Sequence, residues 1–393
     1  MRPGVWNANV LLLGAASFVA DVSGEMLFVV LPSLAVAGGG AGLALGLAGG
    51  LSDGVAEVFK LVGGRWSDRA RVRKPLVLLG YGIAAVGKVG VAAARGWVVL
   101  AGARAFERIG KGIRGAPRDA LLAESVPREA RGAAFGLHRA MDTAGAVGGV
   151  ALAFALVSLA GVSPRTIAYV SAGVAAFALL PLLLVRERPL VAPPPTDLRV
   201  AFRALPPSFR RFAAFAAVLA LGRVTMLFFV FRATQVLPTE RALAGAILLY
   251  LLFNVVYSAT SYPAGRASDV LGRARTVAAG AALFVPCAVG FAYAGGVGSL
   301  ALLFAALGVS YALVETSLRA LAVDEAGGAG KGLALGTLHA VVGVATIVGG
   351  VAAGLLWDAA GPEIAFLWCA AVAALALAIG WGNGALRPRL SVT

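Results

Sequence analysis

The chain has 393 residues, of which 60% are hydrophobic and only 13% are charged, and its mean hydropathy is +0.87. Soluble domains carry about 25% charged residues, so this composition excludes an ordinary water-soluble domain. The net charge of +15 is not accompanied by a compact basic domain with stacking aromatic residues, which argues against a nucleic-acid partner.

Clusters of charged residues and of Pro and Gly divide the sequence into apolar runs. Each run is close to the roughly 20 residues that a helix needs to cross about 30 Å of hydrocarbon. The first run follows Arg2 like a signal peptide, but it continues through Asp21 and Glu25 without a small-residue cleavage site, so we expect a retained helix. We predict twelve membrane-spanning helices, at 8–35, 41–63, 75–94, 97–118, 131–160, 165–185, 211–236, 241–264, 275–295, 298–320, 331–357 and 361–384.

The loops on the two sides of these predicted spans differ in charge. Most loop Lys and Arg residues lie before the first span, after the even-numbered spans and in the tail. The opposite side holds only Arg95, Arg165 and Arg241. By the positive-inside rule, this predicts a multi-pass protein of the cytoplasmic (inner) membrane with both termini in the cytoplasm and with membrane lipids as partners.

One pattern occurs twice, about 200 residues apart, as expected for a duplicated domain. Gly64-Arg65-Trp66-Ser67-Asp68 precedes a basic loop after the second span, and Gly265-Arg266-Ala267-Ser268-Asp269 precedes another after the eighth. The repeat predicts an all-α membrane protein of twelve transmembrane helices in two pseudo-symmetric six-helix bundles. We place the bundles at 1–185 and 211–393, joined by a Pro- and Arg-rich cytoplasmic linker at 186–210, with a substrate path between them.

The repeated segments resemble the signature loop of the major facilitator superfamily, between helices 2 and 3 and again between helices 8 and 9. Arg71 replaces a glycine of the family pattern, which Gly272 keeps in the second copy. The resemblance covers essentially the whole chain, and it implies a twelve-helix transporter in which these loops act as a cytoplasmic gate. The gating-loop residues are Gly64, Asp68, Arg69, Arg73, Gly265, Asp269 and Arg273.

Two further motifs resemble those of proton-coupled exporters. Arg104 in span 4 begins a segment like the Arg-x-x-Gln-Gly motif, in which Glu107 and Arg108 replace the last two residues. Residues 144–149 in span 5 are similar to the antiporter motif Gly-Pro-x-x-Gly-Gly, but they lack its proline. The resemblance therefore implies export by exchange for protons.

Charged residues inside the predicted spans of the first half are numerous. Each would cost about 2.5–3.5 kcal/mol at the bilayer centre, so we expect them to face one another or water. Helical spacing places Asp21 with Glu25 on one stripe. The same spacing predicts structural ion pairs between Glu57 and Lys60 and between Glu107 and Lys111.

These positions supply two groups of candidate site residues. For proton coupling we predict Asp21, Glu25, Arg104, Asp142 and His138. For the substrate cavity we predict Arg108, Lys111, Arg223, Asn254, Tyr257, Glu315, Arg319 and His339. The alternative for each group is a structural role, as a buried ion network or, for the histidines, as helix–helix hydrogen bonds.

The sequence thus predicts a monomeric secondary transporter that exports a small organic solute by alternating access, with protons as the coupling ion. Two alternatives stay open: an uptake or facilitative carrier for an organic anion, and a membrane scaffold or sensor that transports nothing. Enzyme activity, a cofactor and a metal site are not expected, since no nucleophile motif or close ligand cluster occurs. The match of residues 110–115 to G-x-G-x-x-G lies inside an apolar helix and does not predict nucleotide binding.

Overall fold

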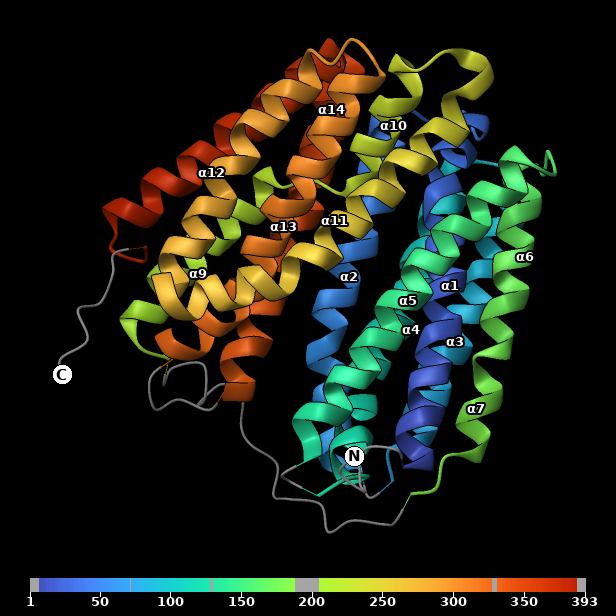
Figure 1. The fold of residues 1–393 in the computed structure, drawn as a ribbon, viewed down its shortest axis with the longest axis vertical. Coiled ribbons are helices and arrows are strands. Elements are labelled where there is room, and N and C mark those ends of the chain that lie inside the picture. The colour runs from blue at the N-terminus through green and yellow to red at the C-terminus, as the bar shows by residue number, and fades with distance from the viewer. Residues whose placement is uncertain (1–6, 71, 128–129, 188–204, 327–330, 387–393) are drawn as a thin grey trace. The chain divides into compact units, whose positions relative to one another are not determined.

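The computed structural model describes residues 7–70, 72–127, 130–187, 205–326 and 331–386. This part of the chain is almost wholly helical and contains no β-strand (Figure 1). Ten helical segments of the described residues are long and apolar enough to cross a membrane. The predicted all-α membrane fold is therefore confirmed. The chain divides into two compact units, with residues 1–40 and 51–195 in unit 1 and residues 41–50 and 196–393 in unit 2.

Unit 1 contains the helices of the first half of the chain, close to the predicted spans. Its first helix begins after Asn7, whose side chain accepts a hydrogen bond from the Asn9 backbone N–H at 2.9 Å and so caps the first turn. The short helices α6 and α7 together cover the span predicted at 165–185. The helices are α1 (Ala8–Ala37), α2 (Gly42–Arg69), α3 (Lys74–Ala93), α4 (Trp97–Glu124), α5 (Arg131–Ser158), α6 (Pro164–Phe177) and α7 (Leu179–Leu184).

Four helices extend well past the predicted spans: α2 continues to Arg69, α4 to Glu124 and, in unit 2, α11 (Ala242–Leu271) to Leu271 and α13 (Val297–Glu325) to Glu325. A helix can continue from hydrocarbon into water because its backbone hydrogen bonds are internal. The repeated signature is consequently helical where a loop was expected. Residues 64–69 form the end of α2, and residues 265–269 lie near the end of α11.

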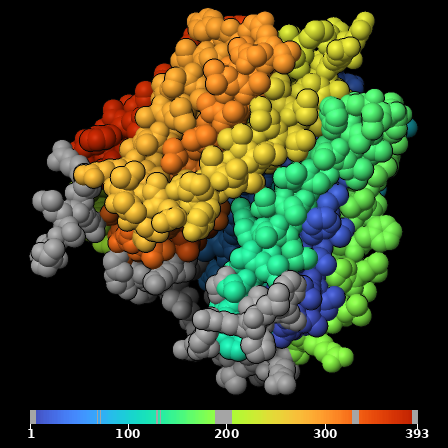
Figure 2. Space-filling model, in the orientation of Figure 1, coloured from blue at the N-terminus to red at the C-terminus, as the bar shows by residue number. Residues whose placement is uncertain are grey.

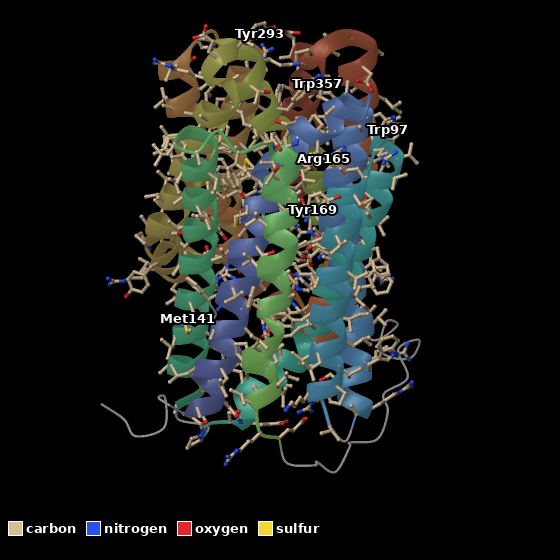
Figure 3. All side chains as sticks on the ribbon, turned by 90° about the vertical axis from the view of Figure 1, so that its right-hand side faces the viewer. Trp97, Met141, Arg165, Tyr169, Tyr293 and Trp357 are labelled. Atoms are coloured by element: carbon tan, nitrogen blue, oxygen red, sulfur yellow. The ribbon has the colours of Figure 1, made fainter. Side chains whose placement is uncertain are left out.

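The packing of unit 1 centres on the pairs α3 with α4, α1 with α5 and α1 with α6. On α5, Met141 packs over Gly14 of α1, and Figure 3 shows Met141 on the ribbon of that helix. In the space-filling view, α5 runs along the visible surface of unit 1 (Figure 2). Only 22% of the most apolar window of this helix is buried in the protein, so most of this window is exposed.

Unit 2 contains the helices of the second half. Its core includes a cluster of aromatic rings, in which Phe229 lies 4.8 Å from Phe291 and 5.2 Å from Phe366 between ring centroids. The helices are α9 (Pro207–Gly222), α10 (Met226–Val236), the short 3-10 helix η2 (Thr239–Arg241), α11, α12 (Arg273–Ala292), α13 (Val297–Glu325) and α14 (Lys331–Gly382). The long α14 covers the last two predicted spans, and it is interrupted where Gly361 takes a φ of 88° before Pro362.

The first turns of α2 pack within unit 2. The carboxylate of Asp358 accepts hydrogen bonds from the backbone N–H groups of Gly42 and Leu43, at 2.6 and 2.8 Å. A Cβ atom on Gly350 would lie 2.6 Å from the carbonyl oxygen of Gly46, so the two backbones approach too closely for any side chain between them. Small residues commonly permit such contacts between membrane helices.

The predicted linker at 186–210 lies mostly outside the described residues, as does Arg71 of the first signature. Glu187 is described, and its carboxylate caps α3. It accepts hydrogen bonds from the backbone N–H groups of Arg73 and Lys74, at 2.6 and 2.8 Å. A negative group at a helix N-terminus satisfies free N–H donors and interacts favourably with the helix dipole.

Candidate functional site

A stripe of charged residues runs along α4. Their spacing of three or four residues places them on one side of the helix. Because of these charges, α4 is absent from the segments that are apolar enough to span a membrane by composition alone. The stripe is formed by Arg104, Glu107, Arg108, Lys111, Arg114 and Arg118.

Close packing of α3 against α4 brings two more polar residues to this stripe. A Cβ atom on Gly80 would lie 2.7 Å from the carbonyl oxygen of Gly110, so the two helices touch through their backbones here. Tyr81 and Lys88 are seven residues apart on α3, hence on one face, and both are buried. That spacing is the sequence signal that could have identified the pair, and neither was among the predicted site residues.

Glu107 is the centre of a buried ion network on α4. Its carboxylate lies 2.6 Å from Nη1 of Arg104 and 3.3 Å from Nε of Arg108. Arg104 is fully buried, and its Nε donates to the Ser52 hydroxyl at 2.9 Å. The ion pair predicted between Glu107 and Lys111 is therefore wrong, because the rotamer of Glu107 directs its carboxylate to the two arginines. The pair predicted between Glu57 and Lys60 is present.

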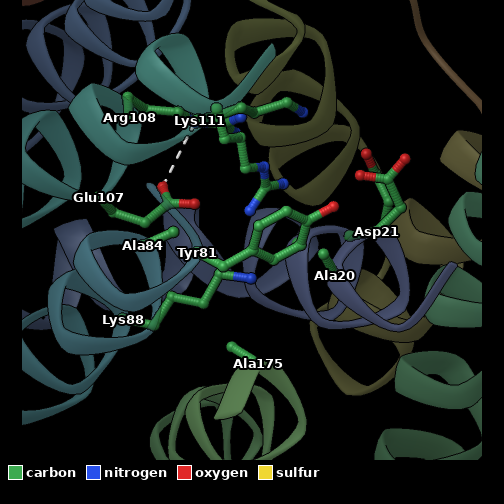
Figure 4. Close-up of a pocket in the computed structure, with 12 residues that line it drawn as sticks. Ala20, Asp21, Tyr81, Ala84, Lys88, Glu107, Arg108, Lys111 and Ala175 are labelled. Carbon is green, nitrogen blue, oxygen red and sulfur yellow. Dashed lines mark ion pairs between the residues drawn. The ribbon is translucent and has the colours of Figure 1, made fainter. Parts of the chain in front are cut away.

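A pocket opens beside this network within unit 1, and Figure 4 shows it with the ion pair of Arg108 and Glu107 dashed. It collects side chains from α1, α3, α4 and α6, and it brings together four of the predicted site residues: Asp21, Glu25, Arg108 and Lys111. Within the described part of the chain, Asp21 and Lys111 form no ion pair closer than 4.0 Å. The pocket is lined by Ala20, Asp21, Gly24, Glu25, Tyr81, Ala84, Lys88, Glu107, Arg108, Lys111, Arg114 and Ala175.

Two of the cations in the pocket are held by groups other than carboxylates. The Lys88 ammonium donates to the Ser23 hydroxyl at 2.5 Å, and Ser23 in turn donates to the Ser171 carbonyl at 2.6 Å. The Arg114 guanidinium lies over the Tyr81 ring, with Cζ 3.8 Å from the ring centroid. Tyr81 and Arg114 are 1% and 6% exposed, and the Tyr81 hydroxyl has no hydrogen-bond partner among the described residues.

Two predicted coupling residues, His138 and Asp142 on α5, do not line this pocket. Asp142 forms an ion pair with Arg139 at 3.5 Å, and its second carboxylate oxygen is buried without a hydrogen-bond partner in the described residues. His138 is 4% exposed, and its Nε2 likewise has no partner there. Arg118 of α4 donates to the Ser17 hydroxyl of α1 at 2.7 Å. This is a polar contact of unit 1 whose arginine does not line the pocket.

Unit 2 has a polar group of its own around Arg223, which lies between α9 and α10. Arg223 forms an ion pair with Glu315 at 3.5 Å, and its guanidinium lies 4.0 Å from the centroid of the Tyr311 ring. Arg319 lies 3.8 Å from the other carboxylate oxygen of Glu315. The structure thus brings together three of the predicted cavity residues: Arg223, Glu315 and Arg319.

The other predicted residues of unit 2 have different surroundings. Asn254 donates to the Tyr250 carbonyl of its own helix at 3.0 Å, and Tyr257 stacks on Phe253 with 6.0 Å between ring centroids. His339 is half-buried on α14. No group of three or more His, Cys, Asp or Glu side chains suited to a metal ion occurs among the described residues of either unit.

The predicted gating residues form the same ion pair in both copies of the repeat. Arg73 pairs with Glu124 at the end of α4, and Arg273 pairs with Asp324 near the end of α13. Asp269 is exposed, and within the described residues it forms no hydrogen bond or ion pair. The side chain of Asp68 lies outside the described residues.

Comparisons with known proteins agree on the type of fold. The family model of the Major Facilitator Superfamily matches residues 13–242. The chain is 34% identical over 363 residues to an uncharacterized MFS-type transporter, MJ1317 of Methanocaldococcus jannaschii, covering 92% of this chain and 91% of that protein. It is 28% identical to the uncharacterized protein Rv2265 of Mycobacterium tuberculosis, with 89% of this chain and 86% of that protein covered.

Among solved structures, the nucleoside transporter NupG superposes with a TM-score of 0.77 at 16% sequence identity, covering 97% of this chain and 99% of that chain. At this level of identity, the likeness shows the fold alone.

Proposed function

Because the chain belongs to the major facilitator superfamily of transporters, we propose that it is a secondary active carrier that couples the movement of a small organic solute to protons. The observation that supports coupling is the position of Asp21. Its carboxylate lines the unit 1 pocket without an ion pair among the described residues, whereas Glu107 is held by two arginines. A carboxylate that alternates between a wet and a dry environment can bind and release one proton in each cycle.

The proposal keeps the predicted transport mechanism. Residues 1–185 and 211–393 are the two bundles whose rocking gives alternating access, and the protein acts as a monomer in the cytoplasmic membrane with both termini in the cytoplasm. For the direction of solute transport, the first candidate is export in exchange for protons. It is supported by the glycines of the antiporter-like segment in α5, since Gly145 and Gly149 pack against the backbone of α1 at Phe18 and Val22.

An uptake or facilitative carrier for an organic anion is the second candidate. The specific observation in its favour is the excess of cations in the pocket, where Lys88, Arg108, Lys111 and Arg114 face three carboxylates. A net positive pocket attracts an anion and disfavours a cation.

Flux from proteoliposomes tests coupling and direction together. Liposomes with the purified protein are loaded with a mixture of small organic acids, amines and neutral solutes, and release is followed by mass spectrometry with and without a proton gradient. Proton entry that accelerates the release of one solute supports export by exchange. Uptake of a solute together with protons supports the second candidate. Release that does not depend on the gradient contradicts proton coupling and favours the facilitative form of the second candidate. An absence of flux beyond protein-free liposomes favours the scaffold.

A further inference from the structure

We infer that Tyr81, Lys111 and Arg114 form an oxyanion-binding site in the unit 1 pocket, and that the transported solute carries a carboxylate or phosphate group. The inference rests on the proposed function, because it names the class of solute that the proposed carrier binds. The site comes from two helices, α3 and α4, which the contact between Gly80 and Gly110 holds close together.

The first support is the way in which Arg114 is held. Its guanidinium lies over the Tyr81 ring, with Cζ 3.8 Å from the ring centroid, and within the described residues no carboxylate is close enough to form an ion pair with it. An aromatic face stabilises the cation without occupying its N–H donors, which point outward in the guanidinium plane. Arg114 thus keeps a planar pair of donors for a carboxylate or phosphate, the groups that arginine binds in bidentate geometry.

The Tyr81 hydroxyl is the second support. It is buried and has no hydrogen-bond partner among the described residues, and a buried polar group without a partner is destabilising. Figure 4 shows the ring in the pocket, with the hydroxyl pointing toward the side where Asp21 lies. Lys111 and Arg114 can only donate hydrogen bonds. Neither cation can accept the hydroxyl hydrogen, and within the described residues the Asp21 carboxylate does not accept it either, so an oxygen of a bound anion would supply the missing acceptor.

The balance of charge in the pocket is the third support. Glu107 is already shared by Arg104 and Arg108, so it does not neutralise the other cations. Lys111 lines the pocket, is exposed, and forms no ion pair closer than 4.0 Å with a described residue. The remaining cations of the lining, Lys88, Lys111 and Arg114, face the carboxylates of Asp21 and Glu25, which leaves one positive charge in excess that an oxyanion would neutralise.

Binding to the purified full-length protein in detergent, at fixed pH and ionic strength, tests the inference without any transport step. The probes are matched pairs with one carbon skeleton: benzoate with benzamide, and phenyl phosphate with phenol. Each is titrated while the melting temperature is followed, because a ligand that binds only the folded protein raises it. We expect benzoate or phenyl phosphate to raise the melting temperature and its neutral partner to leave it unchanged.

Three variants locate the site. Tyr81→Phe keeps the ring under Arg114 and removes only the unpartnered hydroxyl, so we expect a melting temperature without probe that is no lower than that of the unmodified protein. We expect its affinity for the anion to be about tenfold lower, as for one hydrogen bond to a charged group. Arg114→Gln should abolish the shift. Arg165→Gln is the control, since this arginine is exposed on α6, outside the pocket, and bonds the Ala94 carbonyl (Figure 3). If Arg114→Gln does not fold, Tyr81→Phe alone decides the test.

Equal shifts for the two members of each pair would overturn the inference, as would equal affinities for the anion in Tyr81→Phe and the unmodified protein. The two proposals fail separately. Proton-coupled flux of a neutral or cationic solute without anion binding removes the inference and leaves the proposed function. Selective anion binding without proton-coupled flux removes the proposed proton coupling and leaves the anion-binding site.

Discussion

The carboxylate of Asp358 on α14 caps the first turn of α2, where it accepts a hydrogen bond from the Gly42 backbone N–H at 2.6 Å. A second bond from the Leu43 N–H, at 2.8 Å, makes the cap bidentate. The two residues are 316 positions apart in the sequence, so the cap is a tertiary contact that links the start of one helix to the middle of another. We expect Asp358→Ala to lower the free energy of unfolding by about 1 kcal/mol, the usual cost of losing an N-cap.

Thermal unfolding of the purified protein in detergent checks this expectation. Glu240→Gln is the matched control, because Glu240 is an exposed acid with no hydrogen bond or ion pair among the described residues. Equal melting temperatures for Asp358→Ala and Glu240→Gln would show that the cap contributes nothing to stability.

Gly350 is predicted to tolerate no larger side chain. A Cβ atom there would lie 2.6 Å from the Gly46 carbonyl oxygen, so Gly350→Ala must separate α14 from the start of α2. We expect a loss of about 1–3 kcal/mol, as for other overpacked cores. Gly148→Ala is the control, since its Cβ would meet open space and alanine favours the helix. Chemical unfolding of both variants should give changes of opposite sign.

Glu107 is predicted to be the most sensitive of the charged residues in unit 1. In Glu107→Gln the fully buried Arg104 would lose its counter-charge, and breaking a buried ion pair from one side costs about 3–5 kcal/mol. The comparison is Arg139→Gln. Its ion pair with Asp142 involves an arginine side chain that is 64% exposed, and such pairs contribute about 0–1 kcal/mol. A similar fall in melting temperature for both variants would contradict the structural role of the Arg104–Glu107 pair.

Asp21→Asn is predicted to uncouple transport from protons. The amide keeps the shape of the side chain in the pocket but cannot carry a proton on and off, so gradient-driven flux in proteoliposomes should fall to the level of protein-free liposomes. Exchange of solute at equal pH on both sides should persist, which shows that the variant still folds and binds. Glu240→Gln serves as the control acid, and gradient-driven flux that survives in Asp21→Asn would remove Asp21 from the coupling role.

The helices were predictable because hydrocarbon imposes one length and one composition on every span. The runs predicted at 75–94 and 131–160 differ from α3 and α5 by no more than two residues at either end. The ends that reach into water were not predictable in this way. Hydropathy falls at the membrane surface whether or not the helix stops there, so the predicted spans end before α2 and α4 do.

The site was predictable in part. Charged residues in an apolar helix are costly unless they face water or one another, so the sequence alone predicts Asp21, Arg108 and Lys111 as candidate site residues. Tyr81 was missed, because a tyrosine in an apolar helix resembles an ordinary core residue, and the sequence does not show its contact with Arg114 of a neighbouring helix. The partner of Glu107 was assigned wrongly because residues three and four positions away are equally near on a helix, and the side-chain rotamer decides between them.

The ionisable side chains around the unit 1 pocket have an electrical consequence. With all of them ionised, Lys88, Arg108, Lys111 and Arg114 outnumber Asp21, Glu25 and Glu107 by one positive charge. Changing the side of the membrane to which an empty pocket opens would displace this charge in the transmembrane field, which is worth about 2.3 kcal/mol per charge for each 100 mV. The return of the empty carrier should therefore depend on voltage, and a monovalent anion in the pocket should remove that dependence.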